Sequence, residues 1–463
     1  MSLPLHYLSL QQAGAQIARG ELSPVALVQS CLARIARLDV SLHAFITLTA
    51  DSALREAYQA ESEIRAGRYL GPLHGIPICH KDMLLTAGVR TTAHSKLLEN
   101  WIPDRDASVV TRLKQAGAIS LGKAACHEFA FGSPGTDEAF PAARNPWNLD
   151  HMPGSSSSGS GAAVAAGMVM AATGTDTGGS VRHPAAACGI VGMKPTYGRV
   201  SLHGVIPLAP SMDHVGPMTR TVVDNALLLQ AMAGHDAQDS HCAKREVPDY
   251  LEYVGLSMRG LRLGVPRRYI DGQPHAPEVL SAFSEAQRVL RSLGATLVDI
   301  DPPGLELAFD AGSRLIAYEA SRYHEANLRD FPDKLGAPLR QRLALGAQCT
   351  QAQYQAALAQ ATMLRETYAK LFASGIDAVI SPGREAPAET MAQLVSNPLG
   401  KRSVANRIYS VTGNPAITLP MGFSREGLPL ALQIAAADFC EPRLYQIASA
   451  YEASAPWVGR HPD

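Results

Sequence analysis

The sequence predicts an α/β fold, in which a central twisted β-sheet, mixed or parallel, is covered by α-helices on both faces. The main observation is a recurring unit of a helix with periodic apolar residues, a glycine and a short apolar strand. The unit occurs in residues 107–126, 277–301 and 354–382. Helices that alternate with short apolar strands are typical of layered α/β proteins, because each helix returns the chain to the same sheet.

The composition indicates a large globular protein with an extensive buried interior. Of 463 residues, 46% are hydrophobic and 18% are charged, which is unlike a disordered chain. Lys and Arg number 41 against 42 Asp and Glu, so there is no basic excess to attract nucleic acid. The seven cysteines show no CxxC spacing, which favours free thiols in a reducing compartment. The start, MSLPLHYLSL, lacks the pattern of a signal peptide, and we expect a cytoplasmic protein.

The individual elements follow from local signals. Residues 8–40 predict two helices, the second beginning at Ser23 as N-cap with Pro24 in the first turn. Residues 74–84 predict a buried strand that runs into a turn, and residues 118–122 a second short strand.

The middle of the chain contains an apolar run and a polar connection. The run of small apolar residues at 162–173 is shorter than the ~20 residues of a membrane span, so it predicts a core helix and no membrane contact. Residues 235–250 are polar and rich in turn formers, and we interpret them as a surface connection. A strand at 261–266 resumes directly after it.

Two clusters of glycine and serine, 153-PGSSSSGSG-161 and 176-DTGGSVRHPAA-186, allow three interpretations. A flexible linker conflicts with the apolar run that follows the first cluster directly. A phosphate-binding loop would need GxxxxGK[ST] or GxGxxG, and both are absent. The third interpretation is serine catalysis, which needs a base beside the hydroxyl.

The sequence offers a lysine as that base. The GxSxG turn that usually accompanies a histidine base is absent, whereas a lysine kept neutral by burial can accept a proton. The candidate is Lys81 in 75-GIPICHKDML-84, after an apolar stretch. A surface lysine that is solvated or paired with Asp82 is the alternative, and the residues alone leave both open.

The two clusters and their surroundings carry a family resemblance. Residues 152–201 match one long motif in order, and supporting stretches are 72-PLHGIPICHKD-82, 144-RNPWN-148, 213-DHVGPMTRTVVD-224 and 411-VTGNPAITLPMGFSREGLPLALQI-434. The chain thereby resembles the amidase signature family of serine hydrolases over nearly its whole length. The resemblance implies a single domain over residues 1–463, with a mixed sheet. Its signature core would span about 70–225, and about 260–463 would complete the sheet and the substrate pocket.

The resemblance implies a Ser-cisSer-Lys triad. Ser180, the last residue of DTGGS, matches the nucleophile, and Ser156 matches the bridging serine, at which the peptide bond is cis in the family. Lys81 matches the base. The predicted oxyanion hole consists of the backbone N–H groups of Thr177, Gly178 and Gly179, together with that of Ser180 itself.

Further residues are assigned around this triad. Phe131 and Gly132 match positions that line the acyl pocket in the family and are the candidate substrate-binding residues. Asp176 and Arg182 are expected to brace the nucleophile loop. The resemblance implies no cofactor. His80, His127, His183 and His214 lack paired ligand spacing, and we expect no metal.

The resemblance implies a hydrolase that cleaves amide C–N bonds through an acyl-enzyme, on small or aryl amides. Carbamates (a urethanase activity) or esters are alternatives in the same site. The glutamine-hydrolysing branch carries an acidic residue that has no match in residues 401–410, which argues against glutamine. The alternative of another class is a non-autonomous subunit of a glutamine-dependent amidotransferase. We expect a monomer or homodimer acting on a small molecule, with specificity set by loops 133–141 and 385–405.

Overall fold

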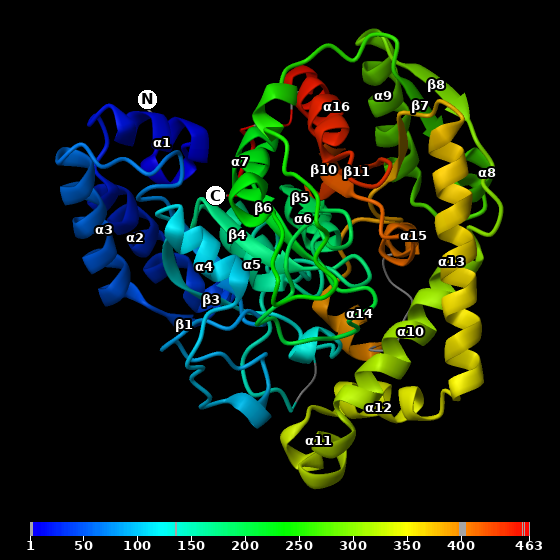
Figure 1. Cartoon of the computed structure of the whole chain (residues 1–463), viewed down its shortest axis with the longest axis horizontal. Helices are drawn as coiled ribbons and strands as arrows, with labels where there is room; N and C mark the ends of the chain where they lie inside the picture. Colours follow the sequence, from blue (N-terminus) through cyan, green and yellow to red (C-terminus); the bar gives the residue numbers. More distant parts are fainter. Residues whose placement is uncertain (1–2, 135–136, 398–403, 456, 458, 463) are drawn as a thin grey trace.

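The protein is organised around one large mixed β-sheet (Figure 1). The computed structural model describes residues 3–134, 137–397, 404–455, 457 and 459–462. In this part of the chain eleven strands pair in the order β1-β3-β2-β4-β6-β5-β10-β11-β9-β7-β8. Their bounds are β1 Phe45–Leu48, β2 Pro77–Lys81, β3 Ile119–Ala124, β4 Ala171–Thr175, β5 Val191–Lys194, β6 Val215–Thr219, β7 Arg262–Val265, β8 Thr296–Asp299, β9 Ala378–Pro382, β10 Ala416–Phe423 and β11 Pro429–Ala435.

Parallel pairs occur in two groups within this sheet. Strand β2 runs parallel to both β3 and β4, and β7 runs parallel to both β8 and β9. The other neighbours are antiparallel, including the β10–β11 hairpin. The predicted α/β fold with a mixed sheet is therefore confirmed.

Helices cover both faces of the sheet. The sixteen α-helices of the described residues are α1 Leu10–Ala18, α2 Pro24–Leu42, α3 Ala50–Arg65, α4 Ser108–Gln115, α5 Ser158–Ala165, α6 Arg182–Cys188, α7 Val222–Met232, α8 Arg267–Asp271, α9 Pro277–Ser292, α10 Leu307–Tyr323, α11 Glu325–Asp330, α12 Ala337–Ala347, α13 Gln351–Ala373, α14 Met391–Ser396, α15 Val404–Thr412 and α16 Glu441–Ser454. Among them, α10 to α13 form the yellow group at one side of Figure 1.

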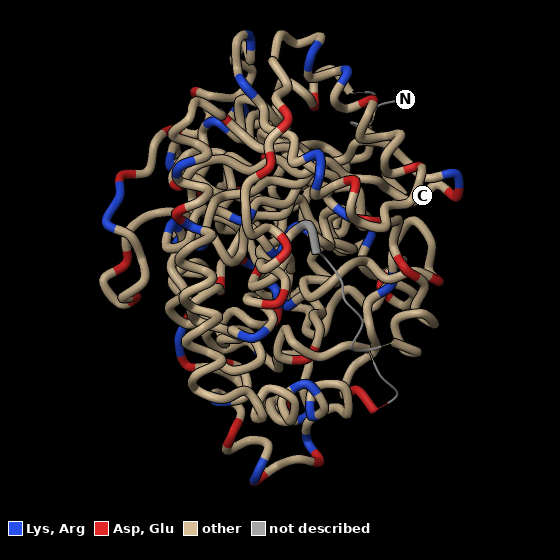
Figure 2. Tube along the Cα trace, turned by 90° about the vertical axis from the view of Figure 1, so that its right-hand side faces the viewer, with Lys and Arg blue, Asp and Glu red and all other residues tan. Residues whose placement is uncertain are grey.

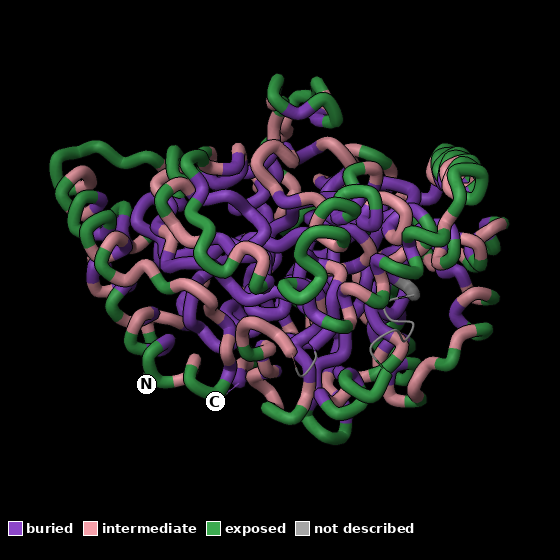
Figure 3. Tube along the Cα trace, turned by 90° about the horizontal axis from the view of Figure 1, so that it is seen from below, coloured by how far each residue is buried: buried purple, intermediate pink, exposed green. Residues whose placement is uncertain are grey.

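The two faces have separate hydrophobic cores. Because successive side chains of a strand point to opposite faces, Ile78 and Cys79 of β2 enter different cores. The core around Cys79 is shared with α2, α3, α5 and α6. The core around Ile78 is the larger one and includes residues of α1, α4, α7, α9 and α16. Figure 3 shows the resulting buried interior beneath an exposed outer layer of helices and loops.

Most predicted elements are confirmed. The three helix–glycine–strand units are α4 with β3, α9 with β8, and α13 with β9. Ser23 caps α2, accepting hydrogen bonds from the backbone N–H groups of Val25 and Ala26.

The prediction of one helix over 162–173 was wrong. Helix α5 ends at Ala165, Gly167 adopts the left-handed conformation (φ 68°), and the last residues of the run, from Ala171 on, belong to strand β4. Strand β4 lies between β2 and β6 and is buried along its whole length. A strand covered on both faces is apolar throughout, so its composition does not differ from that of a buried helix.

Charged residues of both signs are spread along the trace (Figure 2), whereas few are buried. Within the described residues, no helix combines the length and the apolar character that crossing a membrane requires. Lys123 of β3 is one of the buried exceptions. Its Nζ lies 3.7 Å from Oδ1 of the buried Asp82 and donates a hydrogen bond of 2.8 Å to Thr91 Oγ1. Asp82 Oδ2 in turn accepts from the backbone N–H of Thr92 at 2.9 Å.

Replacing Lys123 by Met should lower the free energy of unfolding by about 3–5 kcal/mol, because Asp82 would stay buried without its counter-charge. Denaturant unfolding measures the loss. Lys114→Met is the matched control, since its pair with Asp106 is exposed and should contribute less than about 1 kcal/mol. The double variant Lys123→Met/Asp82→Asn should recover part of the loss. Equal effects of Lys123→Met and Lys114→Met would contradict the prediction.

Candidate active site

The site forms where two parallel strands end. Lys81 is the last residue of β2, and Thr175 is the last residue of the neighbouring β4. Because parallel strands end at the same edge of a sheet, the two side chains meet there. Lys81 is fully buried, and its Nζ donates hydrogen bonds to Ser156 Oγ at 2.8 Å and to Thr175 Oγ1 at 2.6 Å.

The surroundings of Lys81 favour its neutral form. Burial lowers the pKa of Lys81 to about 8, although the carboxylates of Asp176 and Asp213 act in the opposite direction. Asp82, the ion-pair partner considered from the sequence, pairs instead with Lys123. A fraction of Lys81 is therefore deprotonated at neutral pH and can accept a proton from a hydroxyl.

The serine cluster presents one hydroxyl to Lys81. The peptide bond between Ser155 and Ser156 is cis. Ser155 is held from the other side, since its backbone N–H donates to His183 Nδ1 at 2.9 Å. The hydroxyl of Ser157 donates to the Thr175 carbonyl at 3.2 Å. Of these three consecutive serines, Ser156 is the one whose hydroxyl bonds to Lys81.

The second cluster forms a loop between β4 and α6 that carries Ser180. Ser180 is half-buried, and its carbonyl accepts a hydrogen bond of 3.3 Å from the Ser157 backbone N–H, which ties the two clusters together. Asp176 holds the loop from within. Its carboxylate accepts hydrogen bonds from the backbone N–H groups of Gly179 at 2.8 Å and Val181 at 3.1 Å.

Arg182 completes this support. It donates to Asp176 through Nε and Nη2, at 3.0 Å each, within a fully buried ion pair. Burial raises the pKa of Asp176, but the Arg182 guanidinium more than offsets this and holds it below its ordinary value. Arg182 also donates to the Asn406 carbonyl and to Gln433 Oε1, so the loop is anchored to α15 and β11. The expected bracing role of Asp176 and Arg182 is confirmed.

The predicted oxyanion hole lies in this loop. The backbone N–H of Gly179 already donates to Asp176 and is therefore not available to an oxyanion. The backbone N–H groups of Thr177, Gly178 and Ser180 remain as the predicted oxyanion donors. The Thr177 hydroxyl donates to Asp213 Oδ1 at 2.5 Å, which fixes that residue. At Gly178 a Cβ would lie 2.6 Å from Nη1 of Arg407, so the Arg407 guanidinium packs directly against the loop at this glycine.

A cavity of about 390 Å³ opens beside Ser156 and Ser180. The predicted substrate residues Phe131 and Gly132 line it, as do Gly178 and Gly179. Its remaining lining is half apolar and half polar or charged, with two arginines: His127, Ala130, Ser133, Ser155, Leu208, Phe309, Ser313, Ile316, Ala317, Arg342, Leu345 and Arg407. No Asp or Glu belongs to this lining within the described part of the chain.

Three contributors were not found from the sequence. Thr175 contacts Lys81, and Arg342 and Arg407 line the cavity. Thr175 directly precedes the DTGGS motif, and this position could have marked its hydroxyl as a candidate contact of the site. Arg342 of α12 and Arg407 of α15 lie far along the chain from the serine clusters, and nothing in the local pattern distinguishes them.

Of the four histidines considered from the sequence, His127 lines the cavity, whereas His80, His183 and His214 lie outside its described lining. His183 Nδ1 accepts from Ser155, and His214 Nδ1 lies 3.1 Å from the Asp176 carbonyl. Burial lowers the pKa of His80 and of His127 to about 3, so both are neutral. In the portions of the chain that are described, no three His, Cys, Asp or Glu side chains are grouped so that they could hold a metal ion.

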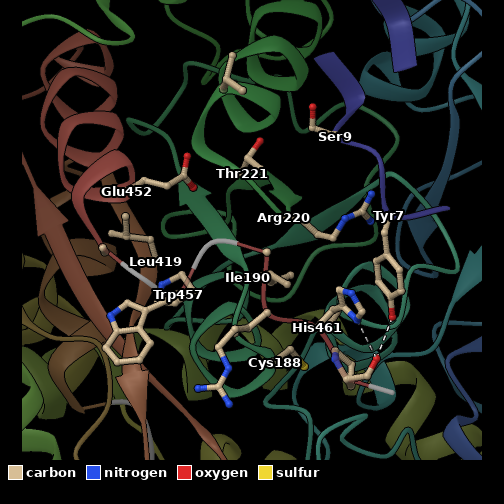
Figure 4. Close-up of a pocket in the computed structure, with 18 of the residues that line it drawn as sticks. Tyr7, Ser9, Cys188, Ile190, Arg220, Thr221, Leu419, Glu452, Trp457 and His461 are labelled. Carbon is tan, nitrogen blue, oxygen red and sulfur yellow. Dashed lines mark hydrogen bonds between the residues drawn. The ribbon is translucent and has the colours of Figure 1, made fainter. Parts of the chain in front are cut away.

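A second cavity, of about 330 Å³, lies elsewhere (Figure 4). It is bordered by Tyr7, Arg220 and Glu452, among others, and Cys188 at the end of α6 reaches it. Burial raises the pKa of Glu452 to about 8, and this carboxyl group accepts from the Val222 backbone N–H at 2.9 Å. The predicted triad is absent from the described lining of this cavity, so the Ser180 cavity is the candidate active site.

The two loops expected to set specificity are described only in part. Residues 135–136 and 398–403 lie outside the described residues. The sequence has no Asp or Glu in residues 401–410 that could match the acidic residue of the glutamine-hydrolysing branch. Residues 401–403 of this segment lie outside the described structure. Residues of α10 and α12 line the cavity as well, and these were not expected.

Comparison with known proteins assigns the family. A family model described as Amidase matches residues 26–445. The chain belongs to this amidase family. Amidase-family enzymes cleave C–N bonds, and the predicted family is confirmed.

The similar proteins within the amidase family are named for different activities. The chain is 40% identical to a subunit of the glutamyl-tRNA(Gln) amidotransferase of Geobacter metallireducens, with 98% of this chain and 99% of the relative covered. It is similar to the solved peptide amidase of Stenotrophomonas maltophilia, with 33% identity, a TM-score of 0.86 and 99% of each chain covered. A 6-aminohexanoate cyclic dimer hydrolase has 28% identity and a TM-score of 0.88, with coverage of 100% and 99%.

Thr175→Val tests the contact of Lys81 with its second hydroxyl. Removing this acceptor should lower kcat/KM for amide hydrolysis about 5- to 10-fold, because the buried amine loses one of two hydrogen-bond partners. Thr175→Ser should keep most of the activity. Thr173→Val, on the same strand but next to His80, is the matched control and should retain near-normal kcat/KM. The prediction fails if Thr175→Val and Thr173→Val behave alike.

Proposed function

We propose that this amidase-family enzyme hydrolyses amides through an acyl-enzyme on Ser180. One observation carries the proposal: the buried Lys81 amine bonds to Ser156, and Ser156 and Ser180 line the same cavity. A serine hydroxyl is a weak nucleophile until a base removes its proton. Lys81 is the available base, since its neighbours in this contact are hydroxyl groups, which do not hold it as an ammonium ion.

The reaction follows from this arrangement. Lys81 takes the proton of Ser156, and Ser156 takes the proton of Ser180, whose oxygen attacks the carbonyl carbon. The tetrahedral oxyanion would be stabilised by the backbone N–H groups of Thr177, Gly178 and Ser180. Ser156, reprotonated by Lys81, then protonates the departing amine as the C–N bond breaks. Water enters by the reverse relay and releases the acid from Ser180.

The same steps serve carbamates and esters, because all three bonds pass through a tetrahedral oxyanion. The apolar part of the cavity, with Phe131, Phe309 and Leu345, supports small or aryl acyl groups. Amides remain the main proposal, since the family model and the peptide amidase both describe amide chemistry.

A second candidate is a component of a glutamine-dependent amidotransferase. It is supported by the 40% identity to the Geobacter metallireducens amidotransferase chain over nearly the full length of both proteins. Glutamine carries an ammonium group, for which the described lining of the cavity offers no carboxylate. We therefore place a self-sufficient amidase first.

The purified chain should hydrolyse simple amides by itself, and Ser180→Ala should lower kcat by about a thousandfold or more. The measurement is turnover of an aryl acylamide, an aliphatic amide, glutamine, an aryl carbamate and a p-nitrophenyl ester. Ser133→Ala, a serine that lines the same cavity, is the control and should stay active. Turnover that survives in Ser180→Ala would refute the nucleophile. Activity that appears only with added amidotransferase subunits would favour the second candidate.

The dependence on pH tests the base. Because the relay needs neutral Lys81, whose pKa is about 8, kcat/KM should rise about tenfold per pH unit below that value. It should level off above the pKa, since the amine is then deprotonated. The profile is measured between about pH 6 and about pH 9 with a neutral amide, and melting temperatures over the same range control for unfolding. A flat profile over this range would argue against Lys81 as the base.

A further inference from the structure

The charged residues in the described lining of the cavity beside Ser180 are all positive. Arg342 from α12 and Arg407 from α15 line it, and within the described residues no carboxylate does. Both guanidinium groups also lie against aromatic rings of the lining. Arg342 Cζ lies 5.4 Å from the centre of the Phe131 ring, and Arg407 Cζ lies 5.2 Å from that of Phe309. The cavity thus combines apolar walls with positive charge.

Arg407 packs closely against two glycines. A Cβ at Gly178 would lie 2.6 Å from its Nη1, and a Cβ at Gly312 would lie 2.7 Å from its Cδ. Two glycines therefore leave the room that this side chain occupies. One of them, Gly178, belongs to the loop that carries Ser180, so the guanidinium lies against this loop and lines the same cavity as Ser180.

Two of the three nitrogens of the Arg407 guanidinium lack a hydrogen-bond acceptor among the described residues. Its Nε and Nη1 are shielded from solvent, and neither has a hydrogen-bond acceptor among the described residues. Burial lowers the pKa of Arg407 to about 10, helped by the nearby Arg342 and Arg182, yet this value still leaves the group charged at neutral pH. Asp176 is the carboxylate that acts on it, and Asp176 is already paired with Arg182. N–H groups that are shielded from solvent and lack an acceptor are costly, and an anion supplied by a ligand would offset that cost.

We propose that Arg407, together with Arg342, binds an anionic group of the substrate, so that the enzyme selects amides that carry a carboxylate. The carboxylate and the scissile amide would be joined by an apolar spacer packed against Phe309 and Leu345. An added ammonium group, as in glutamine, is disfavoured by two cations and finds no carboxylate in the described lining. The substrate class is a monoamide of a dicarboxylic acid. This inference rests on the proposed function and makes it more specific.

The test compares three amides that differ in charge. Glutaramate carries a carboxylate, pentanamide is neutral with the same chain length, and glutamine carries a carboxylate and an ammonium group. The kcat/KM for glutaramate should exceed that for each of the others by about tenfold or more, as a charge-assisted hydrogen bond predicts. Succinamate and adipamate, measured in parallel, allow for a shorter or longer spacer.

Substitution of Arg407 tests whether this residue causes the preference for the monoamide. In Arg407→Met the ratio of kcat/KM for the preferred monoamide to kcat/KM for its neutral counterpart should fall about tenfold or more. Arg407→Lys, which keeps the charge, should retain part of the preference. Arg322→Met removes an exposed cation of α10 and should leave the ratio unchanged. The ratio is the readout because a general disturbance of the loop lowers both values together.

The possible outcomes distinguish a failure of this substrate inference from a failure of the proposed amidase function. Efficient turnover of neutral amides without preference for any monoamide would overturn this inference and leave the amidase proposal standing. An equal loss on both substrates in Arg407→Met would also overturn it, and would assign Arg407 to the oxyanion loop. A higher kcat/KM for glutamine than for glutaramate would also overturn this inference, because the two arginines should disfavour the ammonium group of glutamine. If Ser180 supports no amide turnover at all, the proposed function fails and this inference fails with it.

Discussion

The hydrogen bond between the buried amine of Lys81 and the hydroxyl of Ser156 is the contact on which the candidate chemistry depends. Burial of a lysine is not distinctive in this protein, because Lys123 and Lys194 are also fully buried. Lys123 has the Asp82 carboxylate nearby, and Lys194 donates to the Pro195 carbonyl at 2.9 Å. Lys81 differs in its partners, which are two hydroxyl groups, one of them beside an open cavity.

The loop that carries Ser180 depends on a second buried interaction. Arg182 connects Asp176 inside the loop to Asn406 and Gln433, which come from the last part of the chain. The geometry at Ser180 is therefore set by residues more than two hundred positions apart. A buried ion pair of this kind contributes little net stability, but it fixes the loop in one position because either partner alone would be a buried, uncompensated charge.

Local patterns predicted the fold well where they were strong. The helix–glycine–strand units and the cap at Ser23 were correct because capping and turn chemistry act over a few residues. The run at 162–173 was misassigned, since a strand buried on both faces lacks the alternation that identifies strands. Lys81, Ser156 and Ser180 came from the family resemblance, and the structure brings Lys81 and Ser156 into contact and sets Ser180 in the same cavity. Arg342 and Arg407 could not be predicted, because only tertiary packing brings α12 and α15 to the cavity.

The lining of the cavity comes from several separate stretches of sequence, which include residues 127–133, residues 155–180 and helices after residue 300. The serines and the oxyanion loop come from residues 155–180, whereas Phe309, Arg342 and Arg407 come from helices after residue 300. The two serine clusters and the later part of the cavity lining are thus encoded by different segments of the gene. Mutation or recombination in the later segment can change which compounds are accepted while the earlier segment stays the same. Such a division would let related chains accept different nitrogen compounds while the reaction itself stays the same.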